Sequence, residues 1–144
     1  MGGKVRAVCI SHIRGVKKQE VPGRIRVVAG YGIEGDAHGG NWHRQISLLA
    51  YEKVAEFNRL GGGAENGDFG ENMVVTGIDL RALPVGTQLR LSDALLEVTQ
   101  IGKECHEHCQ IYQRVGDCIM PREGIFAKVI EEGTVEKGDS IEVI

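Results

Sequence analysis

Apolar and polar residues alternate in a series of short runs along the chain. The first run spans Lys4–Ser11 and is rich in β-forming residues. Strict alternation places Val5, Ala7 and Cys9 on one face of this run, while Val8 and Ile10 lie on the other. Because both faces are apolar, the pattern predicts a strand buried on both sides. Similar runs predict strands at Arg24–Ala29, Gln45–Leu49, Asn72–Thr76, Thr87–Leu91, Leu95–Ile101 and Ser140–Ile144.

Two segments have the apolar spacing of helices instead. The first begins near Tyr51, reaches Arg59 and ends at the glycine run 61–63. The second is expected to start at Pro121 or Arg122, where proline suits a first turn, and to continue to Glu132. Its apolar stripe consists of Ile125, Phe126, Val129 and Ile130.

Turns and loops separate these runs. Glycine accounts for 21 of the 144 residues, about twice the usual share of roughly 7%. A turn at Ser92-Asp93 predicts a hairpin, Arg14–Gly23 is a polar connection, Gly30–Gly40 is a glycine-rich loop, and Gly77–Leu83 is a turn region. Many short strands with glycine turns favour a closed sheet, which has no exposed edges. We therefore predict a mainly β fold, a small closed β-barrel with about two helices.

Length and charge narrow the class of protein. A chain of 144 residues fits one domain, which we assign to residues 1–144. A net charge of −3 gives no general attraction for nucleic acid or for an anionic membrane. No apolar run approaches the roughly 18 residues of a membrane span, and the N-terminus has no apolar signal-peptide region. We expect a soluble, cytoplasmic protein, in which clustered cysteines stay reduced and serve catalysis or metal binding.

Three of the four cysteines lie close together in the sequence, after the predicted strand Leu95–Ile101. They are Cys105, Cys109 and Cys118, and their neighbours include Lys103, His106 and His108. A thiolate is the reactive form of cysteine, and nearby positive charge lowers the pKa of a thiol. Lys103 and His106 therefore favour Cys105 as a sulfur acceptor or as a ligand of a soft metal.

Two alternatives remain open for the same segment. Cysteine and histidine side chains are also the usual ligands of tetrahedral zinc, which would make this region a non-catalytic zinc-binding module. Reversible oxidation would instead make it a thiol redox sensor. The zinc set would be drawn from Cys105, His106 or His108, Cys109 and Cys118. Cys9 lies inside an apolar strand, so we assign it to the core.

Glycine, histidine and arginine are combined in residues 32–45. Glycines let backbone N–H groups approach a ligand, and His38, His43 and Arg44 are suited to anionic oxygens such as phosphate. A glycine loop with solvated histidines is the alternative. Trp42 either stacks on a ring or covers the mouth of the barrel. A basic stretch, read as a solvated face, contains Arg14, Lys17, Lys18, Arg24 and Arg26.

The segment 67–72 combines an acid and an amide between a glycine turn and an apolar strand. Such residues either bind substrate or serve as ordinary turn residues. Asn72 is the candidate ligand-binding side chain of this segment.

Taken in order, several of these segments resemble the MOSC domain, the family named for the C-terminal part of molybdenum cofactor sulfurase. The resemblance is closest to the short standalone bacterial proteins of this family. It spans nearly the whole chain and is carried by residues 32–38, 43–49, 70–72, 76–80, 83–87, 101–106 and 117–126.

The resemblance implies a fold related to the β-barrel domain of pyruvate kinase and a role with the molybdenum cofactor. Family members are thought to carry sulfur on a cysteine for metal–sulfur centres or to bind the cofactor itself. In amidoxime-reducing relatives a cysteine of this region ligates molybdenum, and the matching position here is Cys105. The sequence has no recognisable pyridoxal phosphate lysine, so a cysteine desulfurase or molybdopterin-biosynthesis protein is the expected partner of this sulfur carrier or sulfurtransferase.

The leading hypothesis gives each group a role. Cys105 is the nucleophile or molybdenum ligand, and Cys109 and Cys118 are auxiliary or resolving thiols. The residues expected to hold the anionic pterin phosphate or the oxo groups of the cofactor are His38, His43, Arg44, Asn72 and Arg122.

Overall fold

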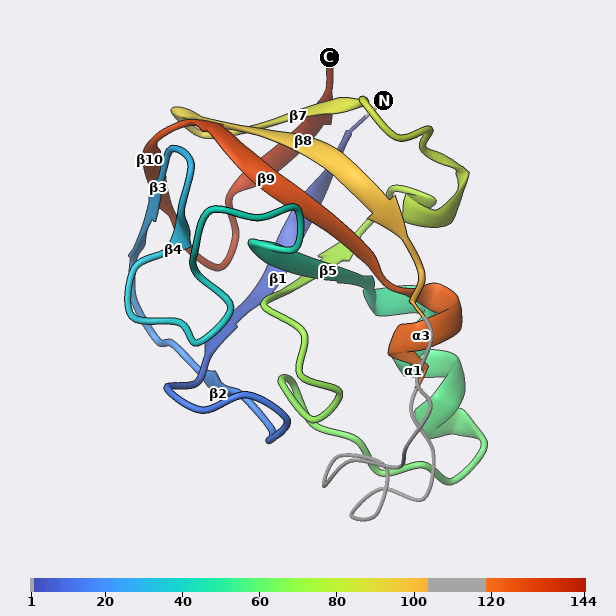
Figure 1. Cartoon of the computed structure of the whole chain (residues 1–144). Coiled ribbons are helices and arrows are strands. Elements are labelled where there is room, and N and C mark those ends of the chain that lie inside the picture. Colours follow the sequence, from blue (N-terminus) through green and yellow to red (C-terminus); the bar gives the residue numbers. More distant parts are fainter. Residues whose placement is uncertain (1, 104–118) are drawn as a thin grey trace.

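Seven strands close into a barrel in the computed structural model, which describes residues 2–103 and 119–144 (Figure 1). These strands are β1 (Gly2–Ile10), β5 (Ile46–Ala50), β6 (Met73–Thr76), β7 (Gln88–Leu91), β8 (Ala94–Ile101), β9 (Ile125–Glu131) and β11 (Ser140–Val143). Their order around the barrel is β1, β6, β5, β9, β8, β7 and β11, and β11 pairs back onto β1. The predicted mainly β fold with a closed barrel is confirmed.

Apolar side chains fill the interior of the barrel with the period of two that strands impose. Alternate residues of β9, namely Ile125, Ala127 and Val129, point into this core, as do Leu89 and Leu91 of β7. The turn between β7 and β8 contains Ser92 in a left-handed conformation, with φ 52°. The predicted hairpin across Ser92-Asp93 is therefore present.

The faces of β1 differ from those predicted. A β-bulge between Val5 and Ala7 shifts the register against β6, so that Val5 and Val8 both face the barrel core. Ala7 and Cys9 lie on the outer face and pack with Val74 under Tyr51 of α1 (Tyr51–Arg59). Strict alternation gave the wrong faces because a bulge inserts one extra residue into the strand. Burial on both faces is correct, and Cys9 belongs to a small outer core cluster.

The second predicted helix, up to Glu132, is wrong. Only α3 (Met120–Glu123) is helical, and from Ile125 the chain continues as strand β9. This strand pairs with β8 on one edge and with β5 on the other, so it lies in the middle of the sheet. Its isoleucine, valine and phenylalanine residues favour strands, and the pairing on both edges outweighs the helix-like apolar spacing.

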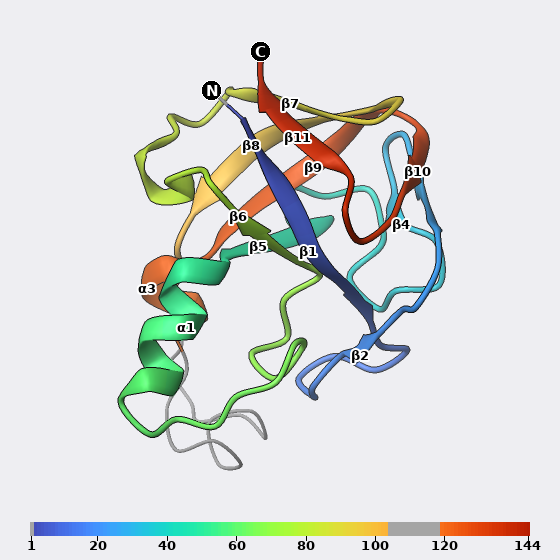
Figure 2. The same ribbon diagram turned by 180° about the vertical axis from the view of Figure 1, so that it is seen from behind.

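The first predicted helix is confirmed. Helix α1 begins at Tyr51, directly after β5, and ends before the glycine run. Glu52 lies in its first turn and Arg59 in its last, which suits the helix dipole. Helices α1 and α3 lie side by side in both views (Figures 1 and 2). Val54, Ile119 and neighbouring apolar side chains form a second core cluster between them.

Smaller elements complete the fold. The polar connection contains β2 (Gln19–Glu20), which pairs with the end of β1 (Figure 2). A separate sheet consists of β10 (Gly133–Val135), β3 (Ile25–Val28) and β4 (Gly32–Ile33), and a 3-10 helix spans Leu80–Ala82. Neither of the two α-helices in the described ranges has the length and apolar character required to cross a lipid bilayer.

Candidate functional site

The loop after β1, the glycine-rich loop and the end of strand β8 meet beside the barrel. A hydrogen bond from the Ser11 N–H to Asp36 Oδ1 (3.1 Å) joins the loop after β1 to the glycine-rich loop. The Ala37 N–H in turn donates to the Ser11 carbonyl at 2.7 Å, and Arg14 Nε donates to the Ala37 carbonyl at 3.2 Å. The glycine-rich loop therefore has a fixed position relative to the barrel.

A buried ion pair lies beneath these loops. Lys18 Nζ is 2.8 Å from Asp36 Oδ1, and both side chains are almost completely inaccessible to solvent, at 1% and 0% exposed. Burial by itself raises the pKa of Asp36, but the hydrogen bond and charge of Lys18 outweigh this effect and lower the pKa below its usual value. The Ser11 and His38 backbone N–H groups act in the same direction. Lys18 is therefore part of an internal pair, and the expectation that it belongs to a solvated face is wrong.

The His38 side chain lies next to this ion pair. Its Nδ1 atom is 3.0 Å from Lys18 Nζ, and its side chain is 28% exposed. Burial and the positive charge of Lys18 lower the pKa of His38 to about 4, although Asp36 acts in the opposite direction. His38 is therefore neutral at physiological pH.

Trp42 connects the residues of the loop. Its indole N–H donates to the His38 carbonyl at 2.7 Å, and its ring is nearly parallel to the His38 imidazole, with centroids 6.3 Å apart. The His43 imidazole is roughly perpendicular to the same ring, with centroids 5.9 Å apart, and the Arg14 guanidinium lies 4.8 Å from the Trp42 ring centroid. The chain's single tryptophan is thus surrounded by the polar side chains of the loop.

His43 and Arg44 are held by one side chain at the end of β8. Gln100 Oε1 lies 2.9 Å from His43 Nε2 and accepts a hydrogen bond from Arg44 Nε at 3.1 Å. The amide nitrogen of Gln100 donates to the Gly102 carbonyl at 2.8 Å. Gln100 therefore connects the glycine-rich loop to the point where the chain leaves the barrel toward Lys103.

Lys103 adds a further positive charge. It lies close enough to His38 to contribute to the low pKa of that histidine. We use the name Trp42 cluster for the group formed by Arg14, His38, Trp42, His43, Arg44, Gln100 and Lys103.

The Trp42 cluster has an excess of positive charge. Within the described part of the chain, none of the ion pairs involves Arg14, Arg44 or Lys103. Among residues 2–103 and 119–144, the carboxylate that binds the cluster is that of Asp36, and Lys18 neutralises it. Guanidinium, ammonium and imidazole N–H groups around a partly buried aromatic ring are suited to an oxyanion such as a phosphate.

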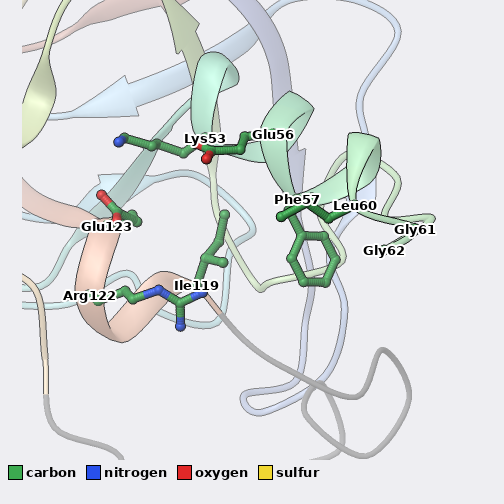
Figure 3. A pocket seen from close by; sticks show the side chains of 9 residues that line it. All are labelled: Lys53, Glu56, Phe57, Leu60, Gly61, Gly62, Ile119, Arg122 and Glu123. Atoms are coloured by element: carbon green, nitrogen blue, oxygen red, sulfur yellow. The ribbon is translucent and has the colours of Figure 1, made fainter.

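Two predicted ligand-binding residues have none of their recorded contacts with the Trp42 cluster. Asn72 is fully buried and binds protein groups: its Oδ1 accepts from the Ser47 N–H at 3.0 Å, and its Nδ2 donates to the Cys9 carbonyl at 3.0 Å. Arg122 lines a groove of about 440 Å³ between α1 and α3 (Figure 3). The side chains of Lys53 and Glu56 line the same groove.

The predicted thiol chemistry falls on Cys105, His106, Cys109 and Cys118, which lie outside the described residues, as does His108 of the zinc alternative. Across residues 2–103 and 119–144, no three histidine, cysteine or carboxylate side chains form a potential metal site. Cys9 is buried, and burial raises the pKa of its thiol well above the ordinary value. This shift favours the thiol form of Cys9 over the reactive thiolate.

The segment 67–72 forms a rigid turn. The Glu71 carboxylate is completely buried and accepts hydrogen bonds from the Gly67 and Phe69 N–H groups, each at 3.0 Å. Burial raises the pKa of Glu71 to about 7, although these backbone bonds act in the opposite direction. The Gly67 carbonyl accepts the Lys18 N–H at 2.9 Å, so this turn supports the backbone of Lys18.

Sequence reasoning missed Lys18, Asp36 and Gln100 as parts of the site. Lys18 lies in a stretch of basic residues, which suggested a solvated face. Its role becomes apparent only from its contacts with Asp36 and His38, which are 18 and 20 positions away in the sequence. Gln100 gave a weak signal, since a polar side chain near the end of an otherwise apolar strand is common. Their roles depend on contacts between segments that are distant in the sequence.

Comparison with known proteins agrees with this fold. The family model of the MOSC domain matches residues 34–142. The YuaD protein from Bacillus subtilis is similar in structure, with a TM-score of 0.79 and 23% identity over 99% of this chain and 96% of that protein. YiiM from Escherichia coli has a TM-score of 0.74 and 20% identity, covering 100% of this chain and 70% of that protein.

YiiM from Geobacillus stearothermophilus is also similar, with a TM-score of 0.68 and 18% identity over 99% of this chain and 73% of that protein. No match was found among curated proteins. At these identities the structural similarity shows a common fold, and the family match covers most of the strands and most of the Trp42 cluster.

Proposed function

Because this chain belongs to the MOSC domain family, which is associated with molybdenum cofactor sulfurase-like function, we propose that it binds the molybdenum cofactor and carries sulfur on Cys105. The sulfur is destined for maturation of this cofactor or of metal–sulfur clusters. The Trp42 cluster is the site at which the anionic groups of the cofactor bind.

The observation that carries this proposal is the excess of positive charge in the Trp42 cluster. Arg14, Arg44 and Lys103 provide cationic donors, and no described carboxylate pairs with them. The donor set fits a phosphate, because guanidinium and ammonium groups form short, charge-assisted hydrogen bonds with phosphate oxygens. His38 and His43 add imidazole groups at the same place. The bound cofactor would supply the redox and sulfur-transfer chemistry of molybdenum.

Sulfur transfer is assigned to Cys105, which follows Lys103 by two positions in the sequence. Its thiolate attacks the outer sulfur of a persulfide on a partner cysteine desulfurase. The new S–S bond forms as the S–S bond of the partner breaks, and the partner cysteine leaves as a thiolate. Cys105 then carries the persulfide, and no external oxidant is consumed. Cys109 and Cys118 act as auxiliary or resolving thiols.

Ligand binding can be tested with Trp42 as a built-in probe, because the chain contains one tryptophan. Titration with inorganic phosphate should change the fluorescence of Trp42. Replacing Arg44 with glutamine should weaken phosphate binding roughly tenfold or more, since hydrogen bonds to charged groups contribute about 1.5–3 kcal/mol. Arg81→Gln is the matched control, because Arg81 is an exposed residue of the 3-10 helix, and its affinity should equal that of the wild type.

Protein isolated from a molybdenum-replete host should contain pterin and molybdenum. Mass spectrometry after incubation with a cysteine desulfurase and cysteine should show one added sulfur, which Cys105→Ser abolishes. Equal sulfur uptake by Cys105→Ser would overturn the assignment to Cys105. Stoichiometric zinc without pterin would instead identify a zinc-binding module, and reversible thiol loss in mild peroxide without sulfur uptake would identify a redox sensor.

A further inference from the structure

The buried ammonium group of Lys18 has three partners. Its Nζ atom lies 2.8 Å from Asp36 Oδ1, 3.0 Å from His38 Nδ1 and 3.5 Å from Ser11 Oγ. The Lys18 side chain is 1% exposed, so water does not compete effectively for these positions. An ammonium group has three N–H donors and no lone pair. Each of its three partners therefore has to be an acceptor.

This requirement fixes the proton of His38. A neutral imidazole has one N–H nitrogen and one acceptor nitrogen, and an imidazolium has two N–H groups. Because Nδ1 faces the Lys18 ammonium at 3.0 Å, Nδ1 must be the acceptor. The ring proton then lies on Nε2. Among the residues that the structure describes, none accepts a hydrogen bond from His38 Nε2.

Asp36 does not favour the opposite tautomer of His38, in which the ring proton lies on Nδ1. Its Oδ2 atom is 3.8 Å from His38 Nδ1, which is too long for a hydrogen bond, and it accepts the backbone N–H of His38 at 3.1 Å instead. The charged groups that act on the imidazole are Lys18, Arg14 and Lys103, which oppose protonation, and Asp36, which favours it. The low pKa of His38 agrees with the hydrogen-bond geometry.

We infer that Lys18 is a positioning residue that holds His38 neutral with its proton on Nε2, so that His38 offers a neutral N–H donor to the oxyanion bound in the Trp42 cluster. The role toward an oxyanion rests on the proposed function, whereas the protonation state of His38 concerns the protein alone. A neutral donor contributes a hydrogen bond without adding a further positive charge beside Arg14, Arg44 and Lys103.

The first test uses the wild-type protein without ligand. Long-range ¹H–¹⁵N NMR spectra of ¹⁵N-histidine-labelled protein distinguish the two neutral tautomers and the imidazolium form. The chain has five histidines, and the signals missing from the His38→Gln spectrum belong to His38. We expect the Nε2–H tautomer and no titration above about pH 5. An Nδ1–H tautomer, or titration near pH 6.5, overturns the proposal.

The second test removes the positive charge. In Lys18→Met, His38 loses a repulsive neighbour and Asp36 loses its partner, so the pKa of His38 should rise by more than one unit. The double variant Lys18→Met/Asp36→Asn avoids an unpaired buried carboxylate and serves if the single variant does not fold. In the double variant the loss of Asp36, which favours protonation of His38, offsets the loss of Lys18, so the readout there is the tautomer. If His38 still carries its ring proton only on Nε2 in the double variant, Lys18 does not fix the tautomer and the proposal is overturned.

The third measurement separates this inference from the proposed function. Addition of inorganic phosphate to the wild-type protein should shift the Nε2 resonance of His38 together with the fluorescence of Trp42. If phosphate changes neither signal, oxyanion binding and the donor role of His38 both fail, and the spectra without ligand still decide whether Lys18 fixes the tautomer. If phosphate shifts Trp42 but not His38, the site binds oxyanions and the donor role alone is wrong.

Discussion

Among single residues, Gln100 shows how one neutral side chain organises a charged site. Its amide oxygen contacts Nε2 of His43 and accepts from Nε of Arg44, and its amide nitrogen binds the Gly102 carbonyl. A carboxylate at this position could accept the same two bonds, but it would cancel the charge of Arg44. The neutral amide orients the two donors and leaves the cluster positive.

The difference between a neutral amide and a carboxylate predicts different phosphate affinities for two substitutions of Gln100. Gln100→Leu removes the acceptor alone, whereas Gln100→Glu keeps an acceptor and adds a negative charge. We expect Gln100→Glu to bind phosphate more weakly than Gln100→Leu by roughly tenfold, which corresponds to about 1.4 kcal/mol of lost attraction. Fluorescence titration of Trp42 measures both affinities. Tighter phosphate binding by Gln100→Glu would contradict the electrostatic explanation.

For the secondary-structure elements, the most informative case is β9. Ile125, Phe126, Val129 and Ile130 have the spacing of a helix stripe, yet the segment is a strand. The interior of the barrel requires only Ile125, Ala127 and Val129, while Phe126 faces the second core cluster beside α1. Two apolar environments on opposite faces of one strand thus produce a pattern that resembles a helix.

The strand assignment can be tested at Lys128, whose side chain is 44% exposed and lies opposite Glu97 of β8. Lys128→Thr and Lys128→Ala both remove the ion pair with Glu97, so their difference reports backbone preference. In a strand, threonine should be more stable than alanine by about 0.5–1 kcal/mol. In a helix, alanine would be more stable than threonine by roughly 0.6 kcal/mol. Urea denaturation of both variants shows which of the two is more stable.

At the scale of the whole molecule, closure of the barrel depends on pairing between the first strand and the last strand of the chain. Strand β1 pairs with β11 through Gly2, Gly3 and Lys4, which closes the sheet into a barrel (Figure 2). On its other side β1 pairs with β6, and there the backbones approach very closely: a Cβ added at Gly3 would lie 2.0 Å from the Thr76 carbonyl oxygen. Gly3 is therefore required by the close packing of β1 against β6.

Gly3→Ala should consequently lower the free energy of unfolding by about 1–3 kcal/mol, because a methyl group has to displace the backbone of β6. Gly2→Ala is the matched control, since its Cβ would be 3.4 Å from the nearest atoms, an ordinary contact. We expect Gly2→Ala to change the stability by less than about 0.5 kcal/mol. Urea unfolding of both variants measures the two effects, and equal stabilities would show that β1 is not tightly packed against β6 at Gly3.

Much of the fold could be predicted from the sequence. The seven predicted strands and the helix at Tyr51 follow local patterns, and each is present with bounds shifted by at most two residues at either end. The faces of β1 and the strand β9 could not be predicted in the same way. A bulge and a central strand are both consequences of pairing partners, and pairing partners are separated by many residues in the sequence.

The site divides in a similar way. The glycine-rich loop with His38, His43 and Arg44 is recognisable from residue types, and the structure places these side chains around Trp42. The recorded contacts of Asn72 and Arg122 had no local signal in the sequence. Asn72 is held by β1 and by Ser47 of β5, and Arg122 by the short helix beside α1.

The sequence by itself determined the family, the mainly β class and the residue types available for binding an anion, because these depend on composition and on short-range pattern. Only the tertiary structure decided that Lys18 is buried against Asp36 and His38, and that Gln100 holds His43 and Arg44. A charged residue has the same side chain whether it is solvated or buried. Its pKa and its hydrogen-bond partners depend on the segments that fold over it.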